Sequence, residues 1–268
     1  MLPLFYLYIF RPIRYFYIIL YLNMELLNKH VTIRKFKNKA IEPELLENIL
    51  YSGTRASTTG NMQTYSMVVT LNKQRKKVLA PLHFNQMAAT SAPVLVTFVA
   101  DFNRFTRWCQ ISKADPGYAN FLSFFTAAID ALLVAQNVCI AAESYGLGIC
   151  YLGTTTYNAE EIIKELKLPA LTFPVTTVAM GYPDETPAPV DRLSLEGVVH
   201  YESYKEYSEE GIRMMYAYKE NLEEMKLFVK ENNKETLAQV FTDIRYKKTD
   251  NEFFSEKMLQ TLKSQGFI

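Results

Sequence analysis

The sequence has few cysteines and histidines and contains none of the common hydrolase or phosphate-binding motifs. Its three cysteines, Cys109, Cys139 and Cys150, form neither a CxxC pair nor an even disulfide framework, which indicates a reducing compartment. None of the three histidines has a cysteine close to it, and this argues against a structural zinc site. Because a Ser-His-Asp constellation, an HExxH motif and a Walker loop are also lacking, hydrolysis and phosphoryl transfer have no basis in the sequence.

The chain also lacks a charge surplus of either sign. Its formal net charge is +1 and it has no basic stripe, so nothing in the composition attracts nucleic acid or an acidic surface. A length of 268 residues with 49% apolar and 21% charged content is typical of one globular domain of enzyme size. We therefore expect a cytoplasmic protein without a nucleic-acid partner.

Residues 1–23 are almost wholly apolar and aromatic, and they are long enough to suggest a transmembrane or signal-anchor segment. Arg11 and Arg14 interrupt them. Two central arginines raise the free energy of membrane insertion by roughly 5 to 7 kcal/mol, whereas about a dozen Leu, Ile and Phe residues lower it by roughly 4 to 7 kcal/mol. A cleavable signal fits poorly, because small residues are missing near the end. We interpret residues 1–23 as a non-native N-terminal extension before a start at Met24, and expect no membrane association.

The rest of the chain reads as alternating helices and strands. Residues 42–50 form an amphipathic helix with proline in its first turn. Short β-branched or aromatic runs predict strands at 65–71, 94–100 and 175–180, which should form one sheet. The run Asn158-Ala-Glu-Glu161 resembles a capping box and predicts a helix ending near Leu168.

A long central helix is predicted at 121–145, which contains neither glycine nor proline and would be about 37 Å long. It is apolar nearly all round, which indicates burial, and surplus apolar surface of this kind favours a partner subunit. From residue 203 onward the pattern changes to charge-rich helix with four candidate packing residues, Leu222, Met225, Leu227 and Phe228. Gly146 and Gly148 lack the third glycine of a dinucleotide fingerprint, so we expect them to terminate the long helix.

The loop at residues 55–65 brings several small polar side chains together. Thr58, Thr59, Asn61 and Gln63 supply hydroxyl and amide groups, and Gly60 allows close approach of the backbone. This composition suits a flat polar ligand. The alternative is an ordinary connection between a helix and a strand, since such residues are common in loops.

Several motifs occur here in the order found in one family. They are this loop, His30-Val-Thr-Ile-Arg34, Ala100-Asp-Phe-Asn-Arg104, Ala135-Gln-Asn137, Ala141-Ala-Glu-Ser144, Gly146-Leu-Gly-Ile-Cys-Tyr-Leu-Gly153 and the segment from Gly181 to Arg192. With them the chain resembles the FMN-dependent nitroreductases, and within these the oxygen-insensitive NADPH nitroreductase and flavin reductase branch. The resemblance implies an α+β fold of three layers, with a mainly antiparallel central sheet flanked by helices, in an intertwined homodimer. It further implies an FMN-binding domain at 24–202 and a C-terminal helical arm at 203–268 that packs on the same domain or on the partner subunit.

The resemblance also implies the cofactor site. Arg34 would give electrostatic support to the flavin ring, Arg192 would close on the phosphate, and Val190 stands where a lysine is usual. Arg245 would line the substrate pocket. The hydroxyl residues of the 55–65 loop would come from the opposite subunit. The full set of implied FMN contacts is His30, Thr32, Arg34, Thr58, Thr59, Asn61, Gln86, Tyr151, Leu152, Gly153 and Arg192.

By the same resemblance the chain is an oxidoreductase in which the flavin carries the chemistry, with no metal and no catalytic side chain. It would take hydride from NADPH or NADH and reduce nitroaromatics, quinones or flavins by a ping-pong mechanism. Two alternatives remain open at this point: a flavin-binding protein without significant turnover, and a specialised reductase or dehalogenase of the same fold.

Overall fold

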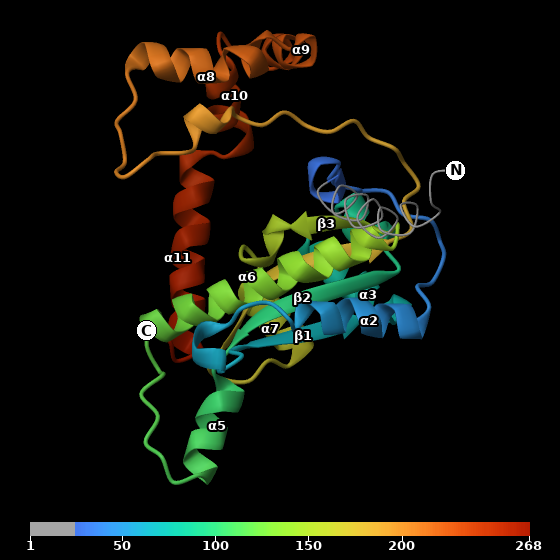
Figure 1. Cartoon of the computed structure of the whole chain (residues 1–268), viewed down its shortest axis with the longest axis vertical. Helices are drawn as coiled ribbons and strands as arrows, with labels where there is room; N and C mark the ends of the chain where they lie inside the picture. Colours follow the sequence, from blue (N-terminus) through green and yellow to red (C-terminus); the bar gives the residue numbers. More distant parts are fainter. Residues whose placement is uncertain (1–24) are drawn as a thin grey trace, which may run out of the picture. The chain divides into compact units, whose positions relative to one another are not determined.

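The computed structural model describes residues 25–268, so the expected extension at 1–23 lies outside the described residues. The chain divides into two compact units. The first contains the residues up to Pro189 together with Met258–Ile268, and the second is Val190–Lys257 (Figure 1). Each unit is treated by itself below.

A four-stranded sheet forms the centre of the first unit. The strands run in the order β1-β2-β4-β3 and every neighbouring pair is antiparallel; their bounds are β1 (Tyr65–Thr70), β2 (Val94–Asp101), β3 (Gly148–Leu152) and β4 (Thr172–Gly181). This confirms the α+β class and the three predicted strands. Strand β4 begins three residues before the predicted start, because a register shift between Phe98 and Val99 accommodates Pro174, which cannot donate to the ladder.

Helix α6 (Phe121–Ser144) packs on the sheet through β2 and β4 (Figure 1). Its buried face is rich in alanine, and Asn120 caps its N-terminus by accepting a hydrogen bond from the Ser123 amide at 2.9 Å. The helix ends as predicted, because Gly146 adopts a φ of +75° that a residue with a side chain rarely takes. Cys139 is buried in this helix, as predicted, and burial raises the pKa of its thiol to about 12.

Among residues 25–268, helix α6 alone is long and apolar enough to cross a membrane by length and composition. The core helix of a globular protein meets the same criterion, and α6 has a buried face that packs on β2 and β4. Its opposite face bears exposed apolar side chains, of which Leu122 is 74% and Phe125 54% exposed. The helix therefore has an apolar surface that the described residues leave uncovered.

The remaining helices of the first unit surround this core. Helix α2 lies directly against α6, where a Cβ on Gly53 would come within 2.4 Å of Val138 Cγ2. The other elements are α2 (Pro43–Gly53), η1 (Thr59–Asn61), α3 (Lys73–Leu82), α4 (Met87–Ser91), α5 (Asn103–Ile111), η2 (Gly153–Thr155) and α7 (Ala159–Leu166). The C-terminal end of α11 (Lys248–Ser264) belongs to this unit, and Phe267 is fully buried beside Phe124.

The second unit is helical. It consists of η3 (Leu195–Gly197), α8 (Glu209–Asn221), α9 (Glu223–Glu231), α10 (Leu237–Val240), η4 (Phe241–Arg245) and the first part of α11. A full capping box at Thr236 and Gln239 opens α10, whose Leu237 and Val240 are buried. The predicted arm at 203–268 and its packing on its own domain or on a partner stay predictions.

Two local predictions are wrong. Asn158 makes no side-chain cap; its amide donates instead to the carbonyl of Leu82 at 2.7 Å. Leu227, expected to pack, is exposed.

Candidate functional site

The segment that carries His30, Thr32 and Arg34 lies along strand β3. Thr32 forms a parallel bridge with Ile149, and the Ile33 amide donates to the Ile149 carbonyl at 2.9 Å. A Cβ on Gly148 would lie 2.5 Å from Ile33 Cγ1, so only glycine permits this approach. The sequence therefore fixes an extended segment at the edge of the sheet and holds the backbone of Arg34 in a defined place.

His30 is anchored by a carboxylate near the C-terminal end of α6. Its Nδ1 lies 2.6 Å from Glu143 Oε1. Burial raises the pKa of Glu143, and the facing imidazole opposes that shift. The contact fixes the orientation of the ring, and Nε2 has no partner among the described residues.

Arg34 is held by its backbone, which leaves its side chain available. The amides of Arg34 and Lys35 both donate to Glu185 Oε1, the second at 2.9 Å. These two hydrogen bonds are the main reason why the pKa of Glu185 is lowered. Within residues 25–268 the Arg34 guanidinium forms no hydrogen bond or ion pair, so its five N–H donors can serve a ligand.

The end of strand β3 provides an open turn. Leu152 is fully buried and Gly153 is exposed at the start of η2, where an added Cβ would meet no atom within 4 Å. The Tyr151 hydroxyl donates to Gln136 Oε1 of α6 at 3.3 Å, and burial raises the pKa of this phenol. A flat group could therefore approach the backbone at Gly153 without displacing a side chain.

Gln86 lies beside this turn because the loop before it is tied to η2. Fully buried His83 shares a hydrogen bond of 3.1 Å between its Nδ1 and Thr154 Oγ1, and Gln86 follows at the N-cap of α4. Burial lowers the pKa of His83 to about 4, so the ring is neutral at pH 7. Sequence reasoning missed His83, because a single histidine between two turns gives no signal of this contact.

The loop with Thr58, Thr59 and Asn61 is attached to the other half of α6. The amide and hydroxyl of Thr59 donate to Asp130 Oδ1 at 3.0 and 3.3 Å, and those of Thr64 donate to Oδ2 at 3.2 and 2.8 Å. Asp130 is only 1% exposed, so its carboxylate depends on these four hydrogen bonds. In the sequence, the only signal that Asp130 holds a loop is that it is an acidic residue in an otherwise apolar stretch of helix. This signal does not show which loop it contacts.

The structure thus separates the predicted contacts of the first unit into two groups. His30, Thr32 and Arg34 lie along β3 and the Tyr151–Gly153 turn ends that strand, while the Thr58–Asn61 loop is bound to Asp130 of α6. Glu143, which holds His30, and Asp130 are 143 − 130 = 13 residues apart on one helix, which corresponds to about 20 Å. One subunit therefore holds His30 and the loop at distant points of α6, whereas the Tyr151 hydroxyl contacts Gln136, between these two points.

Comparisons with known proteins decide the family. The model of the nitroreductase family matches residues 27–182. The chain belongs to the nitroreductase family. It is 30% identical over 252 residues to an NADPH-dependent oxidoreductase of Staphylococcus epidermidis, covering 91% of this chain and 97% of the relative.

Solved structures agree with this assignment. A crystal structure from Bacteroides fragilis has a TM-score of 0.89 and 56% identity, covering 91% of this chain and 99% of the other. The NADPH:FMN oxidoreductase of Vibrio harveyi, complexed with NAD+, has a TM-score of 0.77 and 26% identity, covering 91% and 98%. This nitroreductase is therefore an NAD(P)H-dependent flavin oxidoreductase.

The residues around β3 fit a flavin. An unpaired guanidinium and a histidine with one ring nitrogen available lie along β3, and an open glycine turn follows the strand. These groups match the needs of a ligand with a flat ring, polar edges and a phosphate. The individual flavin contacts stay predictions.

The two remaining predicted residues belong to the second unit of the nitroreductase. Arg192 Nη1 donates to the carbonyl of Asp191 at 2.9 Å, and the Arg245 guanidinium lies 4.6 Å from the centre of the Phe228 ring. The Asp191 carboxylate accepts from Lys219 Nζ at 3.0 Å. The ion pair between Lys219 and Asp191 could not be predicted from the sequence, because the two residues are 28 positions apart. The roles of both arginines stay predictions.

Proposed function

We propose that this nitroreductase is a cytoplasmic homodimer that binds FMN in two sites at the subunit interface. It takes hydride from NADPH or NADH and reduces nitroaromatics, quinones or free flavins. The observation that carries the interface sites is the separation of about 20 Å along α6 between Glu143, which holds His30, and Asp130, which holds the Thr58–Asn61 loop. We expect two copies to pair through the exposed apolar face of α6, with the Thr58–Asn61 loop of one subunit contributing to the flavin site of the other.

The V. harveyi relative is named an NADPH:FMN oxidoreductase, which supports FMN as the flavin and NADPH as the donor. Bound FMN supplies hydride acceptance and two-electron transfer to a second substrate. The chain's own part is binding and electrostatics. His30 and Arg192 would hold the phosphate, Arg34 would donate to the polar edge of the ring and stabilise negative charge there, and Gly153 would leave the ring face accessible.

The decisive test is the absorption spectrum of the purified protein. We expect a flavin band that bleaches under anaerobic NADPH and returns when a quinone is added. Steady-state kinetics should give parallel lines when one substrate is varied at several levels of the other, because both substrates use the same flavin face. A colourless protein that cannot be reconstituted with FMN would contradict the proposal.

Two arginine variants should separate binding from electrostatic support. Arg192→Ala should weaken FMN binding by about 1 to 3 kcal/mol and regain near-normal turnover when FMN is added in excess. Val190→Lys should strengthen binding by supplying the missing cation.

Arg34→Ala should slow flavin reduction and lower the flavin potential even at saturating FMN, because the lost charge acts most on the reduced ring. Stopped-flow reduction and potentiometry check this.

An Arg34→Ala protein with unchanged potential and reduction rate would show that the arginine only anchors the cofactor. Equilibrium titration of Arg192→Ala and Val190→Lys without any change in FMN affinity would show that these residues do not contribute to phosphate binding.

A further inference from the structure

A separate cavity of the first unit is lined by lysines. Its volume is about 560 Å³, and it lies between residues 37–40, helix α3 and the C-terminal end of α4. None of the proposed FMN contacts lines it. We call it the lysine pocket, after Lys37, Lys39, Lys73, Lys76 and Lys77; its fourteen lining residues include no aspartate or glutamate.

Two of the five ammonium groups are occupied within the protein. Lys76 Nζ donates to the carbonyls of Ala92 and Pro93 at 2.8 and 2.7 Å. Lys39 Nζ lies 3.6 Å from Glu42 Oε1 and 3.8 Å from the centre of the Tyr182 ring. The other three have no hydrogen bond or ion pair among the described residues, so the pocket holds a surplus of positive charge.

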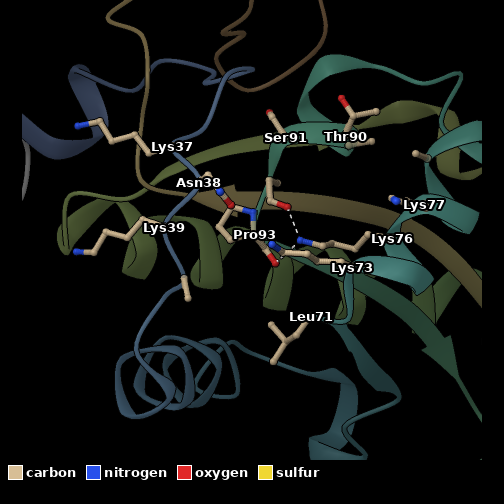
Figure 2. A pocket seen from close by; sticks show the side chains of 14 residues that line it. Lys37, Asn38, Lys39, Leu71, Lys73, Lys76, Lys77, Thr90, Ser91 and Pro93 are labelled. Carbon is tan, nitrogen blue, oxygen red and sulfur yellow. Dashed lines mark hydrogen bonds between the residues drawn. The ribbon is translucent and has the colours of Figure 1, made fainter.

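The first turns of α3 add to this surplus. Lys73, Lys76 and Lys77 lie there without any acidic residue in the helix, although the N-terminal end of a helix favours negative charge; Arg75 of the same turns is paired with Glu165 at 3.6 Å. Figure 2 shows Lys73 and Lys76 extending toward the same point beside Pro93, while Lys37 and Lys39 extend away from it on flexible stems. Burial, and then the charge of Lys73, lower the pKa of Lys76. An anion bound at this point would reduce the repulsion between the positively charged ammonium groups of the pocket.

The residues that line the pocket indicate which kind of anion it can bind. Thr90 and Ser91 add two hydroxyl groups to the lining, and Leu71, Ala80 and Pro93 add apolar side chains. Ammonium groups bind phosphate as point charges, and the volume is that of a small-molecule site. We infer that the lysine pocket binds a small phosphorylated anion, independently of the flavin site.

Calorimetric titration of the FMN-loaded protein with inorganic pyrophosphate, and separately with ADP, tests this inference. We expect saturable binding of both that weakens as salt is raised. The variant Lys73→Ala/Lys77→Ala should weaken it at least about tenfold, since two charge-assisted contacts are lost. The matched control is Lys113→Ala/Lys167→Ala, which removes the same charge elsewhere on the first unit and should change affinity less than about twofold. Tighter binding of ADP would assign the apolar wall to a nucleoside, and equal binding would restrict the site to the phosphoryl groups.

The inference is wrong if pyrophosphate gives no saturable heat, or if the control weakens binding as much as the pocket variant. It is also wrong if the pocket variant becomes a different oligomer in light scattering, because the lysines would then serve a subunit contact. FMN content and quinone reduction should stay unchanged in the pocket variant, so failure here is distinguishable from failure of the proposed flavin site.

Discussion

Asp130→Ala should lower the free energy of unfolding by about 2 to 4 kcal/mol, because the buried donors of Thr64 lose their acceptor. The same change should release the Thr58–Asn61 loop from α6 and weaken FMN binding at least about tenfold if that loop completes the site. Urea unfolding followed by circular dichroism measures the first effect, and fluorescence titration with FMN measures the second.

Thr59→Val is the matched control for Asp130→Ala. It removes one long hydrogen bond from an exposed hydroxyl and leaves Thr64 satisfied, so it should cost less than about 1 kcal/mol. Asp130→Asn should fall between the two, because it keeps one acceptor oxygen. Equal stability of Asp130→Ala and the native protein would show that the carboxylate does not hold the loop.

Phe125→Glu should convert the proposed dimer to a monomer and remove the proposed FMN with it. Phe125 is in the middle of the exposed apolar face of α6, and a two-fold contact would place two carboxylates in one apolar interface. A like-charge contact of this kind costs several kcal/mol, which would raise the dimer dissociation constant by about two orders of magnitude or more. Sedimentation velocity and the ratio of flavin to protein absorbance give both readouts.

Val78→Glu places the same charge on an exposed valine of α3 and should leave the protein dimeric and yellow. The interface proposal fails if Phe125→Glu stays a flavin-loaded dimer. A monomer that keeps its FMN would contradict only the sharing of the site between subunits.

The helices and strands that could be predicted from the sequence are those whose residue pattern is local. Helix α6 is a long run without glycine or proline, and the β-branched runs of β1, β2 and β4 are each bounded by turn residues. Strand β3 was not predicted, because it begins with Gly148 and its five residues are too few to show a period. The Asn158 cap failed for a tertiary reason: Asn158 Nδ2 donates to the Leu82 carbonyl, and this contact orients the side chain so that it does not cap α7.

The site was predictable only to the extent that it is recorded in motifs. The segment 30–34 and the turn at Gly153 were identified from their resemblance to motifs of the nitroreductase family, and the structure places residue 32 beside Ile149 of β3. The side chains that hold them could not, because His83, Glu143 and Glu185 act across sequence separations of 71 to 151 residues. Local patterns carry no information about such pairs, whereas the fold determines them directly.

Strand β3 is an edge strand, and the segment that includes Thr32 and Ile33 covers its outer side. An uncovered edge presents free N–H and C=O groups on which other chains can assemble. The segment expected to bind the cofactor thus also protects the β3 edge of the sheet from aggregation. A variant that loosens this segment would therefore endanger the solubility of the enzyme together with its redox activity, and loss of colour and precipitation would share one cause.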